Sequence, residues 1–511
     1  MEEEVGEEKK DTPIINRDEN NQILPNKENN NKKDIDFQLV EINNKMRTTI
    51  YICLVLINTF SSCDGGIIPQ QNTNIKKDFG DENENTLVGF FGSVDYIGRV
   101  IGAIIFSFIL GKMNRKIILF LTLILKAITL FIAVPFGGSI INIIFRGISG
   151  ISQVFYTSYL PVWCDQYGKK KQRTLMVMFM QLGNPFGIII GYGIAMVCDM
   201  ITKNSNYHGW RVAFGFEGVI LVICAFIIFC FNKKYFSEKF VLIDDNIGKE
   251  EIKKEEESDK KLINFKNILK ILCNKLFLFT TLSNSISFFG LGIVQYWGDQ
   301  YMEIILKIEG NLRFVIFAVL CLLGPILGMI FGGLVCSKLG GYNKKKAMIF
   351  VMIITAIASI ISSFITINDN MAVFIIFTLS YLFFICAPIS PESGIIISSL
   401  DNHLRGDGFA LSNSLLNLLG SFPSSYIFGA LSDLYESKLS KELVENNKHY
   451  VYAWFTCMAY NYVGVILIII AGCFRFKIKG DLSSNPEEEI ENIEGIDISS
   501  STTSKDLISD Q

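Results

Sequence analysis

Charged residues are scarce in this chain of 511 residues: they make up 19% of it, whereas half of the residues are hydrophobic and the mean hydropathy is +0.35. A water-soluble surface cannot be assembled from that balance. The few charges are also segregated into the first 47 residues, residues 232–275, short loops and the tail from Lys477. Because a lipid bilayer imposes such segregation, the composition predicts an integral membrane protein.

Several functional signatures are missing as well. The twelve cysteines form no CxxC pair and lie mostly in apolar stretches, which favours buried thiols over a metal site or a disulfide. No hydrolase or kinase motif is present, so we expect no enzyme, no cofactor and no nucleic-acid partner. The acidic N-terminus shows no cleavable signal peptide, so the first membrane helix is expected to be the targeting signal.

Long apolar runs are what the chain does contain. Crossing ~30 Å of hydrocarbon takes roughly 20 apolar residues. Runs of that length predict an all-α fold with twelve transmembrane helices, at residues 48–68, 87–110, 117–136, 140–163, 174–198, 211–231, 276–299, 314–336, 347–367, 371–398, 408–432 and 451–474.

The predicted helices fall into two groups of six around one charged segment, which contains KEEIKKEEESDKK and no apolar period. The sequence therefore predicts two six-helix bundles, at residues 47–231 and 276–476, joined by a linker at residues 232–275 with one amphipathic helix near residues 262–272. The polar ends, residues 1–46 and 477–511, are expected to be disordered. Basic residues gather beside the membrane on the side of both termini and the linker, which predicts that all three are cytoplasmic.

Two short basic loops indicate an internal repeat. LGKMNRK stands between predicted helices 2 and 3, and GGLVCSKLGGYNKKK stands between helices 8 and 9. Carriers built from such repeats bind their substrate between the two halves near the middle of the membrane.

Ionisable residues inside the predicted helices are candidate site residues, because a charge in hydrocarbon is costly. Asp64 could bind a coupling proton, or it could meet water at the mouth of its helix. Asp95 and Arg99 are four residues apart and can pair on one helix face. Arg146 could hold a carboxylate or phosphate of an anionic substrate, or a neighbouring helix, and Gln153 shares its face.

Further polar residues leave the choice open. Lys126 and Glu217 could line a cavity, snorkel or pair with a neighbour. Glu392 lies beside two prolines that are expected to break helix 10, which makes it a candidate for the site. Asp299 belongs to a set with Gln295 and Glu303 at a spacing of four, and a solvated rim is the favoured interpretation. The glycines of QLGNPFGIIIGYG and of residues 324–333 predict close helix packing.

The order of these motifs resembles the major facilitator superfamily over nearly the whole predicted core, and within it the Spinster-like carriers. The stretch LNLLGSFPSSYIFGALSDL resembles that family's LLGDxPSPxxxGxxSD signature, and RGISGISQVFYTSYLPVWCDQYGKKKQRTLMV is similar to its helix 4 motif. GKMNRK resembles the family's GDRYNRK loop. The resemblance implies alternating-access transport of lysophospholipids or related sphingoid lipids, with proton coupling in some members, in an endolysosomal or plasma membrane.

The resemblance also implies roles for single residues. Asp64 matches the helix 1 aspartate, Arg146 the helix 4 arginine and Arg173 the loop arginine. The basic loop residues that would form a cytoplasmic gate are Lys112, Arg115, Lys116, Arg173 and Lys338.

Four positions depart from the family pattern. An arginine of helix 1 is replaced by Gly65 and an acid of helix 4 by Gln153, while the two loop acids are replaced by Gly111 and Ser337. These departures put proton coupling through helix 4 and the cytoplasmic gate in doubt. The sugar-porter PESPR motif is absent after helix 6, which disfavours a hexose carrier.

The leading hypothesis is therefore a monomeric carrier in a lipid bilayer, in which Arg146 meets an anionic head group and Asp64 is the best proton site. One alternative is a carrier of small organic anions, metabolites or drugs on the same fold. Another is a membrane protein that transports nothing and acts as a scaffold or receptor.

Overall fold

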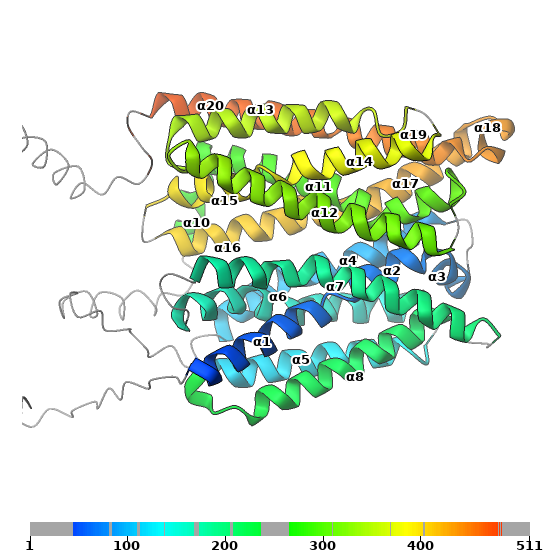
Figure 1. Ribbon diagram of the computed structural model, residues 1–511, viewed down its shortest axis with the longest axis horizontal. Coiled ribbons are helices and arrows are strands. Elements are labelled where there is room, and N and C mark those ends of the chain that lie inside the picture. Colours follow the sequence, from blue (N-terminus) through cyan, green and yellow to red (C-terminus); the bar gives the residue numbers. More distant parts are fainter. Residues whose placement is uncertain are drawn as a thin grey trace, which may run out of the picture. The chain divides into compact units, whose positions relative to one another are not determined.

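The computed structural model is almost entirely helical (Figure 1). It describes residues 44–80, 84–109, 113–136, 138–167, 173–204, 208–236, 265–308, 310–367, 369–401, 404–478, 480 and 482. These residues belong to one contact unit, Ile42–Gln511, and the second unit, Met1–Glu41, lies outside the described residues. Most of the predicted linker and nearly all of both predicted disordered ends also lie outside them.

The first half of the chain forms six long helical segments, the first of which is broken into two helices by a turn at residues 61–63. They are α1 and α2 (Asn44–Phe60 and Asp64–Gln70), α4 (Asn85–Ile109), α5 (Arg115–Ala133), α6 (Ser139–Tyr167), α7 (Arg173–Thr202) and α8 (Gly209–Cys230). A short helix, α3 (Asn72–Phe79), connects the first two segments, and a 3-10 turn, η1 (Lys233–Phe236), follows α8.

The second half repeats this pattern after a short helix, α10 (Phe265–Cys273), which lies where the sequence predicts a helix in the linker. Its long segments are α11 (Lys275–Ile304), α12 (Gly310–Lys338), α13 (Lys345–Ser362), α14 with α15 (Met371–Cys386 and Ile389–Ser398), α16 with η3 and α17 (Arg405–Leu416, Asn417–Ser421 and Phe422–Lys438), and α19 with α20 (Lys448–Ala459 and Asn461–Lys477). The short α18 (Lys441–Glu445) precedes α19.

Ten of the described segments are long and apolar enough to cross a membrane. They coincide with ten of the twelve predicted transmembrane helices, and the predicted all-α membrane fold is confirmed. The other two predicted helices, residues 140–163 and 408–432, are also helical, as α6 and as α16 to α17. Both carry many buried polar residues, which lowers their hydropathy.

Local sequence explains where several helices begin and break. The side chain of Asn114 caps α5 by accepting a hydrogen bond from the backbone N–H of Lys116, at 2.9 Å, and Asn274 caps α11 in the same way. Pro388 and Pro391 stand at the break between α14 and α15, as the sequence predicts, because proline lacks the N–H that an uninterrupted helix needs.

Glycines let pairs of helices approach closely within each half. A Cβ at Gly191 of α7 would lie 1.9 Å from the carbonyl oxygen of Cys63, between α1 and α2. A Cβ at Gly332 of α12 would lie 1.8 Å from the carbonyl oxygen of Ala387, between α14 and α15. The close packing predicted from both glycine-rich stretches is therefore confirmed at these positions.

Equivalent lysines tie equivalent helices in the two halves. Lys116 at the start of α5 donates to the carbonyl oxygen of Phe229, at 2.7 Å, and to that of Phe231, at the end of α8. Lys345 at the start of α13 donates to the carbonyl oxygen of Phe476, at 3.3 Å, near the end of α20. Each lysine stabilises the C-terminal end of the last long helix of its half.

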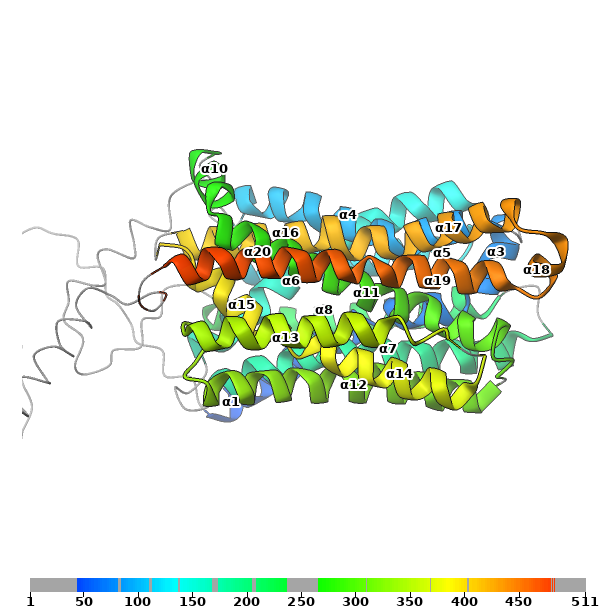
Figure 2. The ribbon, with the colours of Figure 1, turned by 90° about the horizontal axis from the view of Figure 1, so that it is seen from above.

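The halves are joined mainly at one end of the bundle. We call the end where α1 begins, α20 ends and α10 lies the terminal end, and the end with α3 and α18 the far end (Figures 1 and 2). Helix α4 packs along α17, α2 against α11, and α7 against α12. The hydrogen bonds that cross between the halves come from residues near the far end, such as those from Asn85 to Asp433.

Candidate functional site

A cavity of about 470 Å³ lies between the two halves. The sequence predicts six residues for the substrate site, namely Asp64, Asp95, Arg99, Arg146, Gln153 and Glu392. The first five, all from the first half, line this cavity. The second half contributes residues from α11, α12, α14, α15, α16, η3 and α17. A cavity shared by both halves is the place where a rocking carrier holds its substrate.

Asp64 occupies the first turn of α2, directly after the turn that separates it from α1. One carboxylate oxygen, Oδ2, accepts from the Lys126 ammonium, at 2.9 Å, and from Nη1 of Arg146. The other oxygen accepts from the backbone N–H of Gly65, at 2.9 Å. All three side chains are buried, so Asp64 compensates two cations taken from α5 and α6.

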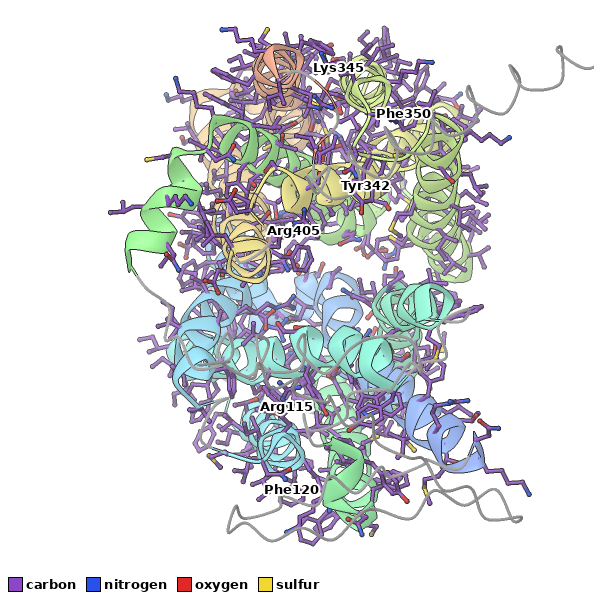
Figure 3. The ribbon with its side chains drawn as sticks, turned by 90° about the vertical axis from the view of Figure 1, so that its left-hand side faces the viewer. Arg115, Phe120, Tyr342, Lys345, Phe350 and Arg405 are labelled. Carbon is purple, nitrogen blue, oxygen red and sulfur yellow. The ribbon has the colours of Figure 1, made fainter. Side chains whose placement is uncertain are left out.

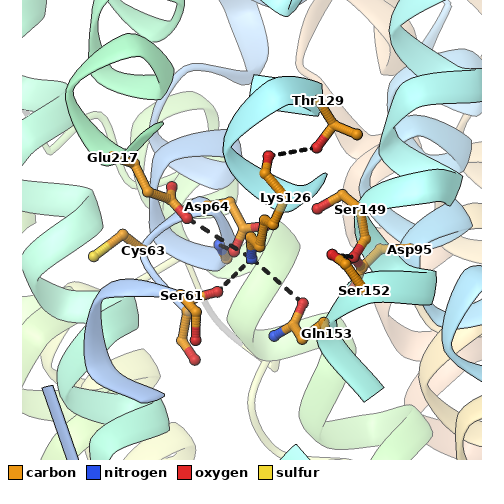
Figure 4. A network of polar contacts seen from close by, with 12 residues as sticks. Ser61, Cys63, Asp64, Asp95, Lys126, Thr129, Ser149, Ser152, Gln153 and Glu217 are labelled. Carbon is orange, nitrogen blue, oxygen red and sulfur yellow. Dashed lines mark hydrogen bonds and ion pairs between the residues drawn. The ribbon is translucent and has the colours of Figure 1, made fainter. Parts of the chain in front are cut away.

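Lys126 joins three further groups in the same cluster (Figure 4). Its Nζ donates to the carbonyl oxygen of Ser61, which the helix break leaves available, and lies 3.5 Å from Oε1 of Gln153. It also lies 3.7 Å from Glu217 of α8, whose carboxylate oxygens have no hydrogen-bond partner among the described residues. The sequence leaves three roles open for Lys126 and Glu217, and in the structure the two residues pair with each other.

Arg146 belongs to this cluster and, like Asp64 and Gln153, faces the cavity. It is 7% exposed and lines the cavity, and its Nε is buried without a hydrogen-bond partner among the described residues. An arginine presents a planar set of donors that matches a carboxylate or phosphate at two points. Only part of that set is engaged by Asp64, so the guanidinium retains donor capacity beside the cavity.

Asp95 and Arg99 form the predicted pair on α4. Nη2 of Arg99 lies 2.7 Å from Oδ2 of Asp95, and its Nε donates to the same oxygen at 3.0 Å. The Arg99 guanidinium also lies over the ring of Tyr96, 4.7 Å from its centroid. The pair lines the cavity and is electrically balanced by itself.

The second half supplies a wall in which the residues that the structure describes include no acidic or basic side chain. Its apolar part comes largely from α11, α12, α14 and α15 and includes Phe288, Leu291, Met329, Ile389 and Ile396. Its polar part consists of amide and hydroxyl side chains on α11, α15, α16, η3 and α17.

Glu392 is not brought to the cavity with the other predicted residues. It lies in the first turn of α15 and is fully buried, while its neighbours Ile389, Ser393 and Ile396 line the cavity. Both carboxylate oxygens lack a hydrogen-bond partner among the described residues. The helix break was readable from the prolines, but the direction of the side chain depends on packing.

The solvated-rim interpretation is wrong for Asp299. This residue of α11 is 1% exposed, lies 3.2 Å from Nε of Arg313 of α12, and accepts a hydrogen bond from the hydroxyl of Tyr192 of α7. Glu303 is more exposed and pairs with the same arginine at 2.8 Å, while Gln295 lines the cavity. Arg313 lies in α12, beyond the loop that follows α11, so the spacing of residues along α11 does not predict its ion pair with Asp299.

The predicted gate residues that the structure describes lie around the terminal end. Figure 3 looks at this end and shows Arg115 on one group of helices, with Tyr342, Lys345 and Arg405 on the other. The Arg115 guanidinium lies 5.6 Å from the ring centroid of Tyr159, and Lys338 is exposed in the last turn of α12. Lys112 and the side chain of Arg173 lie outside the described residues.

Metal chemistry has no support in the part of the chain that the structure describes. No group of three or more histidine, cysteine, aspartate or glutamate side chains there could hold a metal ion. The cluster around Asp64 is instead composed of organic cations and carboxylates, which can bind an anion or exchange a proton.

The chain is similar to known transporters. The model of the Major Facilitator Superfamily matches residues 51–425. A probable sphingolipid transporter, spinster homolog 1 of Arabidopsis thaliana, is 21% identical over 57% of this chain and 60% of its own length. The sphingosine-1-phosphate transporter SPNS2 of Xenopus tropicalis is 21% identical over 70% of this chain and 69% of its own length.

Solved structures share the fold. A bacterial homologue of the human lysosomal transporter Spinster, inward-facing and unoccupied, has a TM-score of 0.67 at 13% identity, over 85% of this chain and 97% of that one. The proton:xylose symporter XylE has a TM-score of 0.61 at 15% identity, over 88% of this chain and all of that one. The matched family model, which covers more than half of the chain, shows that this multi-pass membrane protein belongs to the Major Facilitator Superfamily, a family of secondary transporters rather than enzymes.

Proposed function

We propose that this chain moves an amphipathic anion of the lysophospholipid or sphingoid type across a membrane by alternating access. The observation that carries the proposal is the cavity between the halves, with a buried arginine and carboxylate on one wall and an uncharged, partly apolar wall opposite. A phosphate or carboxylate head fits the first wall and an alkyl chain fits the second. Two Spinster-type relatives, which are named as a probable sphingolipid transporter and a sphingosine-1-phosphate transporter, support the same substrate class.

Competition for Arg146 gives the proposal a mechanism. Asp64 now holds the Nη1 group of Arg146 and also pairs with Lys126. A substrate anion that binds Arg146 replaces the ion pair between Arg146 and Asp64. Less positive charge then surrounds the Asp64 carboxylate, which favours its protonation. Proton binding and substrate binding at neighbouring groups are then coupled, and Gln153 takes no part because it cannot ionise.

The same fold also supports a second candidate, a carrier of small organic anions, metabolites or drugs. A cavity of about 470 Å³ accommodates such a molecule as well. The apolar residues on α12, α14 and α15 favour the lipid, because a small anion would leave them without a partner. The third possibility, a scaffold or receptor that transports nothing, would need no buried charges beside a cavity.

For orientation, we propose that the terminal end faces the cytoplasm of a plasma or endolysosomal membrane. Both described ends of the chain and α10 lie there, and basic residues gather beside it, including Lys338, Lys345 and Lys477. The halves contact each other mainly through residues near the far end, so in this orientation the structure corresponds to a carrier closed to the outside.

Uptake by the full chain in proteoliposomes tests the proposal, with labelled lysophosphatidate and labelled succinate offered with and without a pH gradient. We expect uptake of the lipid only. Arg146→Lys should reduce it at least roughly tenfold because a bidentate contact is lost. Asp64→Asn should abolish the response to the pH gradient.

The matched control is Lys448→Ala, which removes an exposed ion pair with Asp369 at the far end and should leave uptake unchanged. Detergent-purified variants are first compared by size-exclusion profile, so that a folding defect is recognised. Uptake of succinate alone would favour the small-anion carrier. Lipid uptake that survives Arg146→Lys and Asp64→Asn unchanged would refute the site.

A further inference from the structure

Four carboxamide side chains face the cavity from the second half. Asn284 and Gln295 come from α11, Asn413 from α16 and Asn417 from η3. We call them the amide set. None of them makes a side-chain hydrogen bond to another described residue. Asn284 is only 3% exposed, and its Oδ1 is buried without a hydrogen-bond partner among the described residues. A buried polar atom without a partner is costly, so its presence beside a cavity points to a ligand.

Several other polar side chains on the same cavity are already engaged. The amide of Asn58 donates to the carbonyl oxygen of Met180 at 2.7 Å. The hydroxyl of Ser424 donates to the carbonyl oxygen of Ser421 at 2.7 Å, and Ser412 accepts from Thr281 at 3.4 Å. Among the described residues, the amide set therefore forms a group with open hydrogen-bonding capacity on the wall of the second half, and Asn184 of α7 is a further open amide on the opposite wall.

The backbone brings three members of the amide set together. Asn413 and Asn417 are four residues apart, so they lie one turn from each other on the helical segment. A Cβ at Gly420 of η3 would lie 2.3 Å from the carbonyl oxygen of Ser285, so η3 touches α11 beside Asn284. The π-helical turn η3 begins at Asn417, and such turns are frequent at functional sites.

The chemistry of the amide set selects neutral, polar groups. A carboxamide carries both a donor and an acceptor and no charge, so it pairs with a hydroxyl or an amide, which also offer both. An alkyl chain would leave all four amides unsatisfied, and among the described residues of this half no cation lines the cavity to assist in binding an anion.

We propose that the amide set is a neutral hydrogen-bonding subsite that holds a hydroxyl or amide group of the transported molecule, apart from the charged group at Arg146. This inference deepens the proposed function and rests on it only in taking the cavity as the transport site. It predicts a substrate with three features: an anionic group, a neutral hydrogen-bonding group and an apolar part.

Paired ligands that differ by one hydroxyl test the subsite. The probes are lysophosphatidate against its 2-deoxy analogue, and malate against succinate, each titrated against the full chain in detergent by thermal shift. We expect the hydroxylated member of at least one pair to bind about tenfold more tightly or better. Asn417→Leu should reduce that ratio below about threefold by weakening only the hydroxylated member, and Asn417→Gln should keep most of it.

Two further variants keep the test sound. If Asn417→Leu folds poorly, Asn413→Leu replaces it, because Asn413 is at an exposed position; it should likewise weaken only the hydroxylated member of the pair. Asn446→Leu makes the same chemical change near the far end, where Asn446 donates to the carbonyl oxygen of Glu442, and should change neither affinity.

The outcomes separate this inference from the proposed function. Discrimination in the malate pair alone, with neither lipid bound, upholds the subsite and refutes the lipid substrate. Tight lipid binding with a ratio near one refutes the subsite and leaves the lipid substrate standing. A ratio near one in both pairs, or an equal loss for both members in Asn417→Leu, overturns the subsite.

Discussion

Asp64 controls the charge balance of the first half. It is the carboxylate that directly pairs with both Lys126 and Arg146, and the break between α1 and α2 places it in the first turn of a helix, where a negative charge is favoured. The resembled family has an arginine next to this aspartate, and Gly65 stands there in this chain. The additional cation beside Asp64 comes instead from α5, as Lys126.

This balance predicts the stability of variants. Asp64→Asn removes the carboxylate that pairs directly with two buried cations, leaves Glu217 at 3.7 Å from Lys126, and should lower the free energy of unfolding by ~3 kcal/mol. The double variant Asp64→Asn/Lys126→Gln removes one charge of each sign and should recover much of that loss. Thermal unfolding in detergent measures both. A double variant less stable than Asp64→Asn would contradict the charge-balance account.

At the scale of elements, the first turn of α4 is completed by the opposite half. Asp433 of α17 accepts from the backbone N–H of Asn85 at 3.0 Å, from that of Thr86 at 2.7 Å, and from both of their side chains. The free N–H groups at a helix start usually bind a capping side chain from the preceding residues. Here the cap crosses between halves, so it can hold only while the far end is closed.

Removal of that cap should open the start of α4. Asp433→Ala leaves the N–H groups of Asn85 and Thr86 without their acceptor, so hydrogen–deuterium exchange of residues 85–91 should rise at least roughly tenfold. Asp369→Ala is the control, because it removes an exposed carboxylate that pairs with Lys448 at the same end. Equal protection in Asp433→Ala and the unchanged chain would show that the cap does not hold the far end.

The sequence predicts elements better than it predicts their partners. Apolar runs locate the helices, and Pro388 and Pro391 locate a break, because both signals are local. The pair of Lys126 with Asp64 joins residues 62 positions apart, and that of Arg313 with Asp299 depends on how α12 returns along α11. Lys116, which is predicted for a gate, donates to the carbonyl oxygen of Phe229 in α8, a contact that no loop motif reveals. The π-helical turn at Asn417 likewise has no periodic signature.

Across the whole molecule, we expect one lysine at the far end to respond to whether the two halves are closed there. Lys76 of α3 is 6% exposed, donates to Asn85, and lies 3.4 Å from the hydroxyl of Tyr450 in the second half. Burial lowers the pKa of Lys76 to about 8, although Asp433 and Glu436 of α17 favour the charged form. When the far end opens, water reaches the ammonium and its pKa returns toward ~10.4.

The sign of the resulting pH dependence follows from proton counting. Below pH 8 Lys76 is charged in both states and pH has no effect, whereas between about 8 and ~10.4 the closed state binds fewer protons and gains stability as pH rises. From pH 7 to pH 9 the ratio of closed to open molecules should increase roughly tenfold. Spin labels at Lys77 and Lys438, with Cys230, Cys273 and Cys473 replaced, report that ratio. Lys76→Met should abolish the dependence, and the same pH response in that variant would exclude Lys76 as its source.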